Sequence, residues 1–219
     1  MGVPRHIREE PVSGHRYMVV EMGPFKTGSI RRPCQLTPPS AGLVTAVGDM
    51  HLERFGSLEE IVRAKSELAQ AIPPGGWLVA NADSKGALQI ARGATHCRVL
   101  LYGETSTEEL ATRLENVTFS KQGTTFVLRT ADRTFDCFTP LLGRAFILNL
   151  AGAFTLANAL GVDPEIAVAA MRTLRPVSNR LEVVEERGVT WIRDAYNSNQ
   201  IGFRAALEVV AAMPAARRF

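Results

Sequence analysis

The sequence predicts an α/β protein built on a mostly parallel sheet. Several short runs are apolar almost throughout, as is typical of strands that are covered on both faces. Segments with helical periodicity separate these runs, and this alternation favours parallel strands with helices packed on the sheet. A later region alternates polar and apolar residues and carries turn signals, so antiparallel hairpins are expected beside the main sheet.

Each parallel strand is expected from one apolar run. The four runs are Arg16–Met22 (RYMVVEM), Ala41–Val47 (AGLVTAV), Gly76–Ala82 (GWLVANA) and Cys97–Gly103 (CRVLLYG). The antiparallel region covers 113–140, where Gln122-Gly123 and Ala131-Asp132 predict the turns.

The most informative helix follows the second run. Ser57 suits an N-cap, and Glu60 three residues later completes a capping box. A period of 3.6 residues gives this helix one apolar face, formed by Leu58, Ile61, Val62 and Leu68. Lys65 lies on the same face. A lysine there must snorkel, pair or change its ionisation, and snorkelling is the commonest of these outcomes.

Two helices are expected after the hairpins, over Phe146–Leu160 with Gly161 closing it, and over Pro164–Leu174 with Asp163 as N-cap. The stretch RPVSNR then breaks the pattern and predicts a domain boundary near Pro176.

The boundary divides the chain into domains 1–176 and 177–219. The second domain contains a hairpin (LEVVEERGVTWIRDA) and a helix (IGFRAALEVVAAM). Because about 40 residues are too few to bury a core of their own, we expect this piece to be the start of a longer, truncated domain.

Composition argues against several classes of protein. The net charge is +3, and no basic run carries interleaved aromatics, so a nucleic-acid partner is not expected. The three cysteines are odd in number, widely spaced and without a C-x-x-C, which disfavours disulfides or structural zinc and favours a reducing cytoplasm. The N-terminus lacks the apolar core of a signal peptide. The most apolar segment, AFILNLAGAFTLANALGV, is too short and too polar to predict membrane insertion.

Polar residues follow the apolar runs where ligands bind in open α/β sheets, beyond the carboxyl ends of the strands. Glu21 ends the first run, His51 follows the second, and Asn81 and Asp83 close the third. Lys65 comes from the helix after His51 and could reach the same edge. Each residue alone also fits an ordinary surface or turn position.

A glycine-containing stretch, GPFKTGSI (Gly23–Ile30), superficially suggests a phosphate-binding loop. The pattern G-x-x-x-x-G-K-[ST] is absent, and Lys26 precedes the second glycine. We therefore interpret this stretch as an ordinary loop and not as a nucleotide cradle.

Five motifs together resemble the Mur ligase family of ATP-dependent, amide-bond-forming enzymes in peptidoglycan precursor synthesis. VVEMG, HLERFGSLEEIVRAKSEL, NADS, RLEVV and DAYNSN occur in the family's order, and the resemblance runs from Gly2 to the final helix. HLERFGS and YNSN most resemble the members that add D-alanyl-D-alanine to UDP-N-acetylmuramoyl-tripeptide. The resemblance implies a central ATP-binding domain followed by the start of a Rossmann-like C-terminal domain.

The resemblance also implies a reaction and a metal site. ATP would phosphorylate the carboxylate of the UDP-linked peptide, and the amine of D-alanyl-D-alanine would then displace phosphate. Glu21 and His51 match residues that hold Mg²⁺ near the γ-phosphate. Lys65 matches a lysine that carries CO2 as a carbamate and acts as a further metal ligand.

The remaining implied positions concern the nucleotide. Asn149 matches an asparagine at the adenine, Arg180 and Asp194 match nucleotide contacts, and Asn197 matches a residue near the domain junction. The chain departs from the family at three positions: Ala145 and Phe146 replace a frequent His-Asn pair, and Gln200 replaces a common proline.

The family's phosphate loop and UDP-sugar domain lie upstream of Gly2, and most of its C-terminal domain lies beyond Phe219. We therefore expect the 219 residues alone not to be a competent ligase. Two alternatives stay open: a related ligase for another substrate, such as a folylpolyglutamate-like or cyanophycin-like relative, and a non-catalytic binding module without the phosphate loop.

Overall fold

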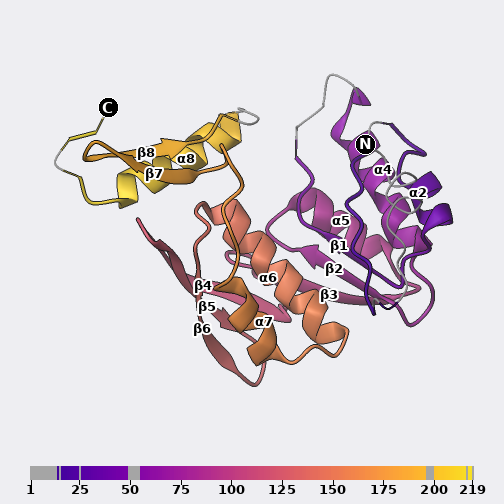
Figure 1. Cartoon of the computed structure of the whole chain (residues 1–219). Coiled ribbons are helices and arrows are strands. Elements are labelled where there is room, and N and C mark those ends of the chain that lie inside the picture. The colour runs from indigo at the N-terminus through magenta and orange to yellow at the C-terminus, as the bar shows by residue number, and fades with distance from the viewer. Residues whose placement is uncertain are drawn as a thin grey trace. The chain divides into compact units, whose positions relative to one another are not determined.

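The computed structural model describes residues 14, 16–24, 26–48, 55–195, 200–215 and 217–218. The chain forms two compact units, residues 1–100 and 101–219, which are described separately (Figure 1). The domain boundary predicted near Pro176 is a different division of the chain, and it stays a prediction.

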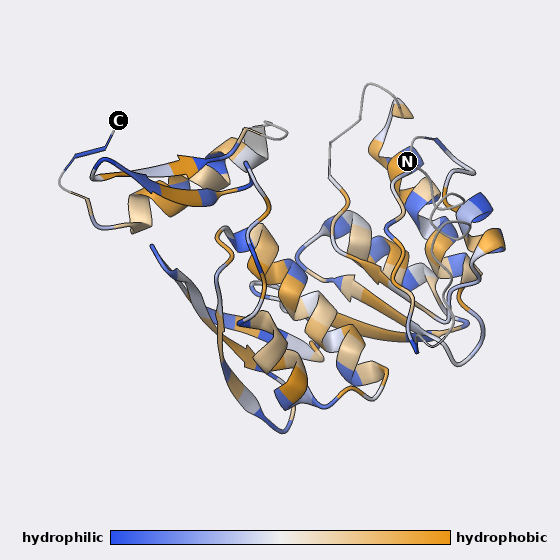
Figure 2. Ribbon diagram, viewed as in Figure 1, coloured by the Kyte–Doolittle hydropathy of each residue, from blue (hydrophilic) through white to orange (hydrophobic). Residues whose placement is uncertain are grey.

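The first unit contains two parallel strands and three described helices. These are α2 (Arg31–Leu36), β1 (Ala41–Val44), α4 (Leu58–Ala71), β2 (Trp77–Asn81) and α5 (Lys85–Gly93). Strand β1 pairs in parallel with β2, and the last pair joins Val44 to Ala80. Every residue of β2 after Trp77 is buried, and Figure 2 shows the apolar character of this strand.

The strands that follow change from parallel to antiparallel. They are β3 (Arg98–Gly103), β4 (Thr112–Ser120), β5 (Gly123–Arg129) and β6 (Thr134–Thr139). Strand β4 is parallel to β3 and antiparallel to β5, which is antiparallel to β6. The hydrogen-bonded strand order is β1-β2-β3-β4-β5-β6. The predicted fold class, a mostly parallel sheet with an added antiparallel region, is confirmed.

The rest of the second unit consists of helices and a separate hairpin. These elements are α6 (Arg144–Ala159), α7 (Pro164–Met171), β7 (Glu182–Glu186), β8 (Val189–Arg193) and α8 (Gln200–Ala212). Strands β7 and β8 form a two-stranded antiparallel sheet. The helices and hairpin expected from the sequence are all present, with ends that differ from the predictions by up to three residues.

Two local capping predictions are confirmed. The Ser57 hydroxyl accepts a hydrogen bond from the Glu60 amide at 3.3 Å at the start of α4. The Asp163 carboxylate accepts one from the Glu165 amide at 2.8 Å at the start of α7. In the β4–β5 hairpin, the turn lies at 121–122, one residue before the predicted position.

The strand predicted over Arg16–Met22 is wrong. The described residues of this segment are irregular and belong to neither sheet. Val19 is 96% exposed, although a run this apolar is typical of a strand covered on both faces. An apolar run becomes a strand only where a neighbouring strand supplies a hydrogen-bonding ladder. The sequence pattern did not reveal whether such a neighbour was present.

Helix α6 packs its buried face on the second unit's sheet. Phe154 contacts Phe135 of β6 edge to face, with 5.3 Å between ring centroids. Gly152 lies against the ring of the buried Tyr102, so close that a Cβ atom at Gly152 would stand 2.6 Å from Tyr102 Cζ. The absence of a side chain at Gly152 therefore sets how closely α6 approaches β3.

We expect Gly152→Ala to lower the free energy of unfolding by about 1–3 kcal/mol, because the added methyl group overpacks the interface. Alanine's better helix propensity, worth about 1 kcal/mol, would offset only part of this cost. Urea denaturation measures the difference. Gly93→Ala at the end of α5 is the matched control, since a Cβ there meets nothing within 4 Å, and it should be neutral or stabilising. Equal effects at both sites would contradict the packing argument.

Candidate functional site

The backbone that leaves β1 is held by side chains from three other elements. We call this segment, residues 45–48, the post-β1 loop. Lys65 Nζ, from α4, donates a hydrogen bond to the Ala46 carbonyl oxygen at 2.6 Å. The Lys65 side chain is half-buried, and burial lowers its pKa from the ordinary lysine value. Lys65 thus pairs with backbone and shifts its ionisation towards the neutral amine.

Asn81, the last residue of β2, fixes the start of the post-β1 loop. Its side chain is buried, and Nδ2 donates to the Thr45 carbonyl oxygen at 2.9 Å. Its Oδ1 accepts from the Asp83 amide, also at 2.9 Å. Both ends of the amide are therefore used within the protein, so Asn81 shapes this edge of the sheet.

Ser84 fixes the far end of the same loop. Its hydroxyl accepts from the Val47 amide at 3.0 Å and lies 3.3 Å from the Val47 carbonyl oxygen. The Ser84 hydroxyl oxygen also caps α5 by accepting from the Ala87 amide. Gly86 allows α5 to come this close, because a Cβ atom there would lie 2.6 Å from Val47 Cβ.

The other predicted metal residues are not brought together with Lys65 by described contacts. Glu21 is exposed in the irregular segment before α2, and no hydrogen bond or ion pair in the described residues joins it to Lys65. His51 lies outside the described residues. Within the described ranges, no group of three or more His, Cys, Asp or Glu side chains is arranged to hold a metal ion.

The predicted nucleotide residues belong to the second unit. Asn149 is exposed on α6, and Arg180 is exposed just before β7. Asp194 follows β8 and is half-buried. Asn197 lies outside the described residues.

A backbone hydrogen bond joins the residue before Arg180 to the residue after Asp194. The Ala195 amide donates to the Asn179 carbonyl oxygen at 3.1 Å, so residues next to the two candidates are joined. Asn179 and Leu181, on either side of Arg180, both have positive φ angles, 59° and 50°. Left-handed backbone is unfavourable for leucine. Leu181 is buried next to Gly143, and its packing there offsets the strain.

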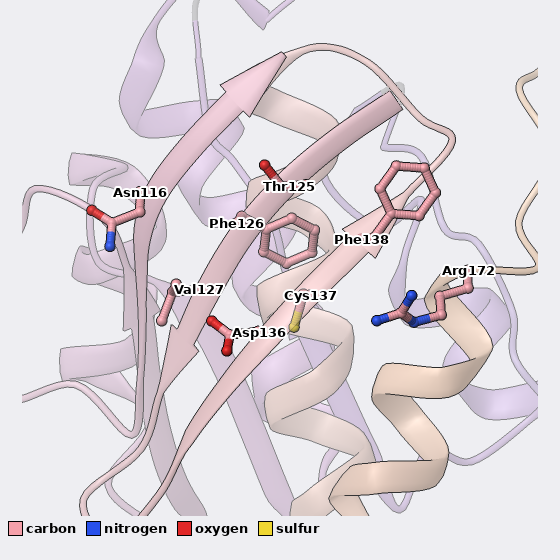
Figure 3. A pocket seen from close by; sticks show the side chains of 8 residues that line it. All are labelled: Asn116, Thr125, Phe126, Val127, Asp136, Cys137, Phe138 and Arg172. Carbon is pink, nitrogen blue, oxygen red and sulfur yellow. The ribbon is translucent and has the colours of Figure 1, made fainter. Parts of the chain in front are cut away.

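A cavity of about 520 Å³ opens on the antiparallel strands and is lined by none of the predicted site residues. Figure 3 shows Asp136 and Cys137 on β6, with Arg172 reaching across from the end of α7. Burial raises the pKa of the Cys137 thiol to about 11. Cys137 is therefore protonated near neutral pH and has little nucleophilic character. All three cysteines are free.

Residues 1–157 match the family model for the Mur ligase middle domain. The chain belongs to the Mur ligase family. Its curated relatives include the UDP-N-acetylmuramoyl-tripeptide--D-alanyl-D-alanine ligases of Bacillus subtilis and Escherichia coli. The first is 29% identical over 196 residues, covering 89% of this chain and 41% of the relative. The second is 31% identical over 202 residues, covering 92% of this chain and 44% of the relative.

Solved structures agree with this assignment. MurF from Acinetobacter baumannii matches with a TM-score of 0.82 at 26% identity, over 90% of this chain and 43% of that one. MurF ligase from Thermotoga maritima in complex with ADP matches in fold, with a TM-score of 0.77 at 24% identity over 91% and 46% of the two chains. The chain thus spans about two fifths of the length of its curated relatives.

Part of the contacts at the post-β1 loop could not be predicted from the sequence. Ser84 was seen only within the NADS motif, although a serine before a run of helix-forming residues is a detectable N-cap signal. Helix α5 was likewise not predicted. No sequence signal identifies the atoms of the post-β1 loop that Ser84 and Asn81 bind, since these lie 37 and 36 residues away, respectively.

Asn81→Asp should lower the free energy of unfolding by about 1–3 kcal/mol near neutral pH, because it removes the donor to Thr45 and faces a carbonyl oxygen with a carboxylate. Acidification should recover part of the loss, since a protonated aspartate can donate. Urea titrations at neutral and acidic pH measure both effects. Gln89→Glu, at an exposed position of α5, is the matched control and should change little.

Lys65 should make stability depend on alkaline pH. Its folded-state pKa is lowered below the unfolded value of about 10.4. In the interval between these values the unfolded chain binds more protons, so stability should rise as pH increases through the folded pKa. The wild type should therefore gain stability relative to Lys65→Met between neutral and alkaline pH in urea titrations. Lys85→Met, at an exposed lysine, is the control for the loss of a surface charge. A difference in the free energy of unfolding between the wild type and Lys65→Met that does not change with pH would contradict the lowered pKa of Lys65.

Proposed function

We propose that this chain is part of an ATP-dependent ligase that joins D-alanyl-D-alanine to UDP-N-acetylmuramoyl-tripeptide. The observation that carries the proposal is the match to relatives of that printed name from several organisms, at 26–32% identity over about nine tenths of this chain. Because those relatives are more than twice as long, the activity proposed is that of a complete protein containing this chain. Such a protein would work in the cytoplasm, where its nucleotide-linked substrates are made.

The reaction class is acyl activation followed by amide formation. The peptide carboxylate attacks the γ-phosphorus of ATP and ADP leaves, which gives an acyl phosphate. The amine of the dipeptide then attacks the acyl carbon, loses a proton, and expels inorganic phosphate. A bound Mg²⁺ would stabilise the charge on the transferring phosphoryl group.

The post-β1 loop is the best-supported part of the site for this chemistry. It lies beyond the carboxyl ends of parallel strands, where ligands bind in α/β sheets. Its backbone is fixed before substrate arrives, which reduces the cost of positioning groups for reaction. His51 follows this loop in the sequence.

We infer that Lys65 carries a carbamate. A partly desolvated lysine is more often neutral, and a neutral amine attacks CO2 to give a carbamate with loss of a proton. An ammonium group cannot bind Mg²⁺, whereas carbamate oxygens are ligands of the type that this ion prefers. The carbamate retains an N–H, so it can keep the bond to Ala46. Glu21 and His51 would complete the set of ligands from this chain.

The nucleotide would be held by residues of the second unit. Asn149 is proposed at the adenine. Arg180 and Asp194 are proposed as nucleotide contacts, supported by the hydrogen-bonded turn that joins their neighbours. Asn197 is proposed near the domain junction.

The decisive test is phosphate release by the full-length protein with ATP, Mg²⁺, UDP-N-acetylmuramoyl-tripeptide and D-alanyl-D-alanine. Lys65→Ala should reduce turnover by at least about 100-fold, because loss of a metal ligand should cost at least as much as loss of a residue that orients one, which costs about 10–100-fold. Lys121→Ala, at an exposed lysine, is the control and should retain activity. Near-normal turnover by Lys65→Ala would overturn its role.

The same assay separates the alternatives. Turnover with a different amino acid but not with D-alanyl-D-alanine would identify a related ligase with another substrate. Absence of turnover, together with absence of a ¹³C-labelled carbamate at Lys65 in bicarbonate buffer, would favour a non-catalytic module.

A further inference from the structure

A buried carboxylate lies two residues beyond Lys65 on α4. Glu67 is 3% exposed. Its oxygens accept hydrogen bonds from the backbone amides of Gly28 at 2.5 Å, Ile30 at 3.1 Å and Arg31 at 2.9 Å. No lysine or arginine side chain in the described residues forms an ion pair with it. Among the described residues, three backbone amides are the partners of this carboxylate, so each of these bonds offsets part of the cost of burying it.

These three amides belong to the glycine-containing stretch that resembled a phosphate-binding loop, and to the start of α2. Ile30, the N-cap of α2, makes no capping bond with its own side chain. Glu67 supplies the missing acceptor from 36 to 39 residues away. The anionic group held by these amides is thus the protein's own carboxylate.

Helix α2 in turn contacts the segment that carries Glu21. Cys34 Sγ, buried in α2, donates to Met22 Sδ at 3.6 Å. Burial raises the pKa of the Cys34 thiol, and the nearby Glu67 charge raises it further, so the thiol keeps the proton that it donates. A continuous set of contacts therefore runs from α4 through α2 to the residue next to Glu21.

We propose that Glu67 is a positioning residue that ties the segment bearing Glu21 to the helix bearing Lys65. Helix α4 then positions both candidate metal side chains. It carries Lys65 itself, and it holds the segment of Glu21 through Glu67, α2 and Met22. This inference rests on the proposed function for the metal roles of Glu21 and Lys65, but the mechanical link does not depend on them.

The test compares the wild-type chain with Glu67→Gln, which keeps the shape but loses the charge and one acceptor. Amide hydrogen exchange should accelerate at least about tenfold at Gly28, Ile30 and Arg31, because hydrogen bonds to a charged acceptor are the stronger ones. Amides of β2 and α5 in the same molecules should change much less. The ¹⁵N order parameters of residues 18–22 should fall towards the flexible range, below about 0.6.

Two further variants make the result specific. Glu59→Gln, an exposed position on the same helix, should leave all these values unchanged. Glu67→Asp keeps the charge but is one methylene shorter, and it should give an intermediate effect, which also covers the case in which the glutamine variant does not fold. Uniformly faster exchange across the chain, or unchanged order parameters at residues 18–22, would overturn the proposal.

Binding of Mn²⁺, measured by electron paramagnetic resonance in bicarbonate buffer, separates this inference from the proposed function. Weaker binding by Glu67→Gln than by Glu59→Gln would support both. A wild-type chain that binds no Mn²⁺ would count against the proposed metal site, while exchange and order parameters would still decide the role of Glu67.

Discussion

The backbone that leaves β1 must find new hydrogen-bond partners once the sheet ladder ends at Val44, and the arrangement of this edge depends on how it does so. Three side chains supply those partners, one each from α4, the end of β2 and the start of α5. Since buried backbone polar groups are costly when unpaired, the post-β1 loop can follow few other courses. Elements distant in sequence are thereby fixed around one short segment.

Helix α4 has a double part in this arrangement. Lys65 holds the loop after β1, and Glu67 holds the loop before α2. Both are polar side chains that are at least partly buried on α4, where apolar residues would ordinarily pack. Their partners are backbone atoms, so each contact specifies the course of a chain segment and not only the identity of one neighbour.

Most of the fold could be predicted because its signals are local. The Ser57 and Asp163 caps, the burial of β2, and the alternation in β4–β6 all follow from residues within a few positions of each other. Lys65 could be singled out for the same reason, since its neighbours on the helix are apolar. The error over Arg16–Met22 arose because strand formation depends on a partner strand that periodicity does not identify.

The site was less predictable because its contacts are long-range. The sequence pointed to Asn81 and Glu21, but their surroundings depend on tertiary structure: Asn81 binds backbone, while Glu21 is exposed in an irregular segment. The burial of Glu67 was not predicted, because a glutamate in a helix ordinarily faces solvent. The family resemblance supplied roles that local patterns could not, and those roles for Glu21, His51, Asn149, Arg180, Asp194 and Asn197 stay predictions.

The state of Cys137 has a consequence for oxidation chemistry. With a pKa of about 11, only roughly one molecule in ten thousand carries the thiolate near pH 7. Peroxide and alkylating reagents react with thiolates, so the folded protein should pass through oxidising conditions with this sulfur intact. Once the sheet opens, the same thiol regains ordinary acidity and becomes reactive. The buried sulfur is thus chemically silent in the native protein and becomes a natural marker of its unfolding.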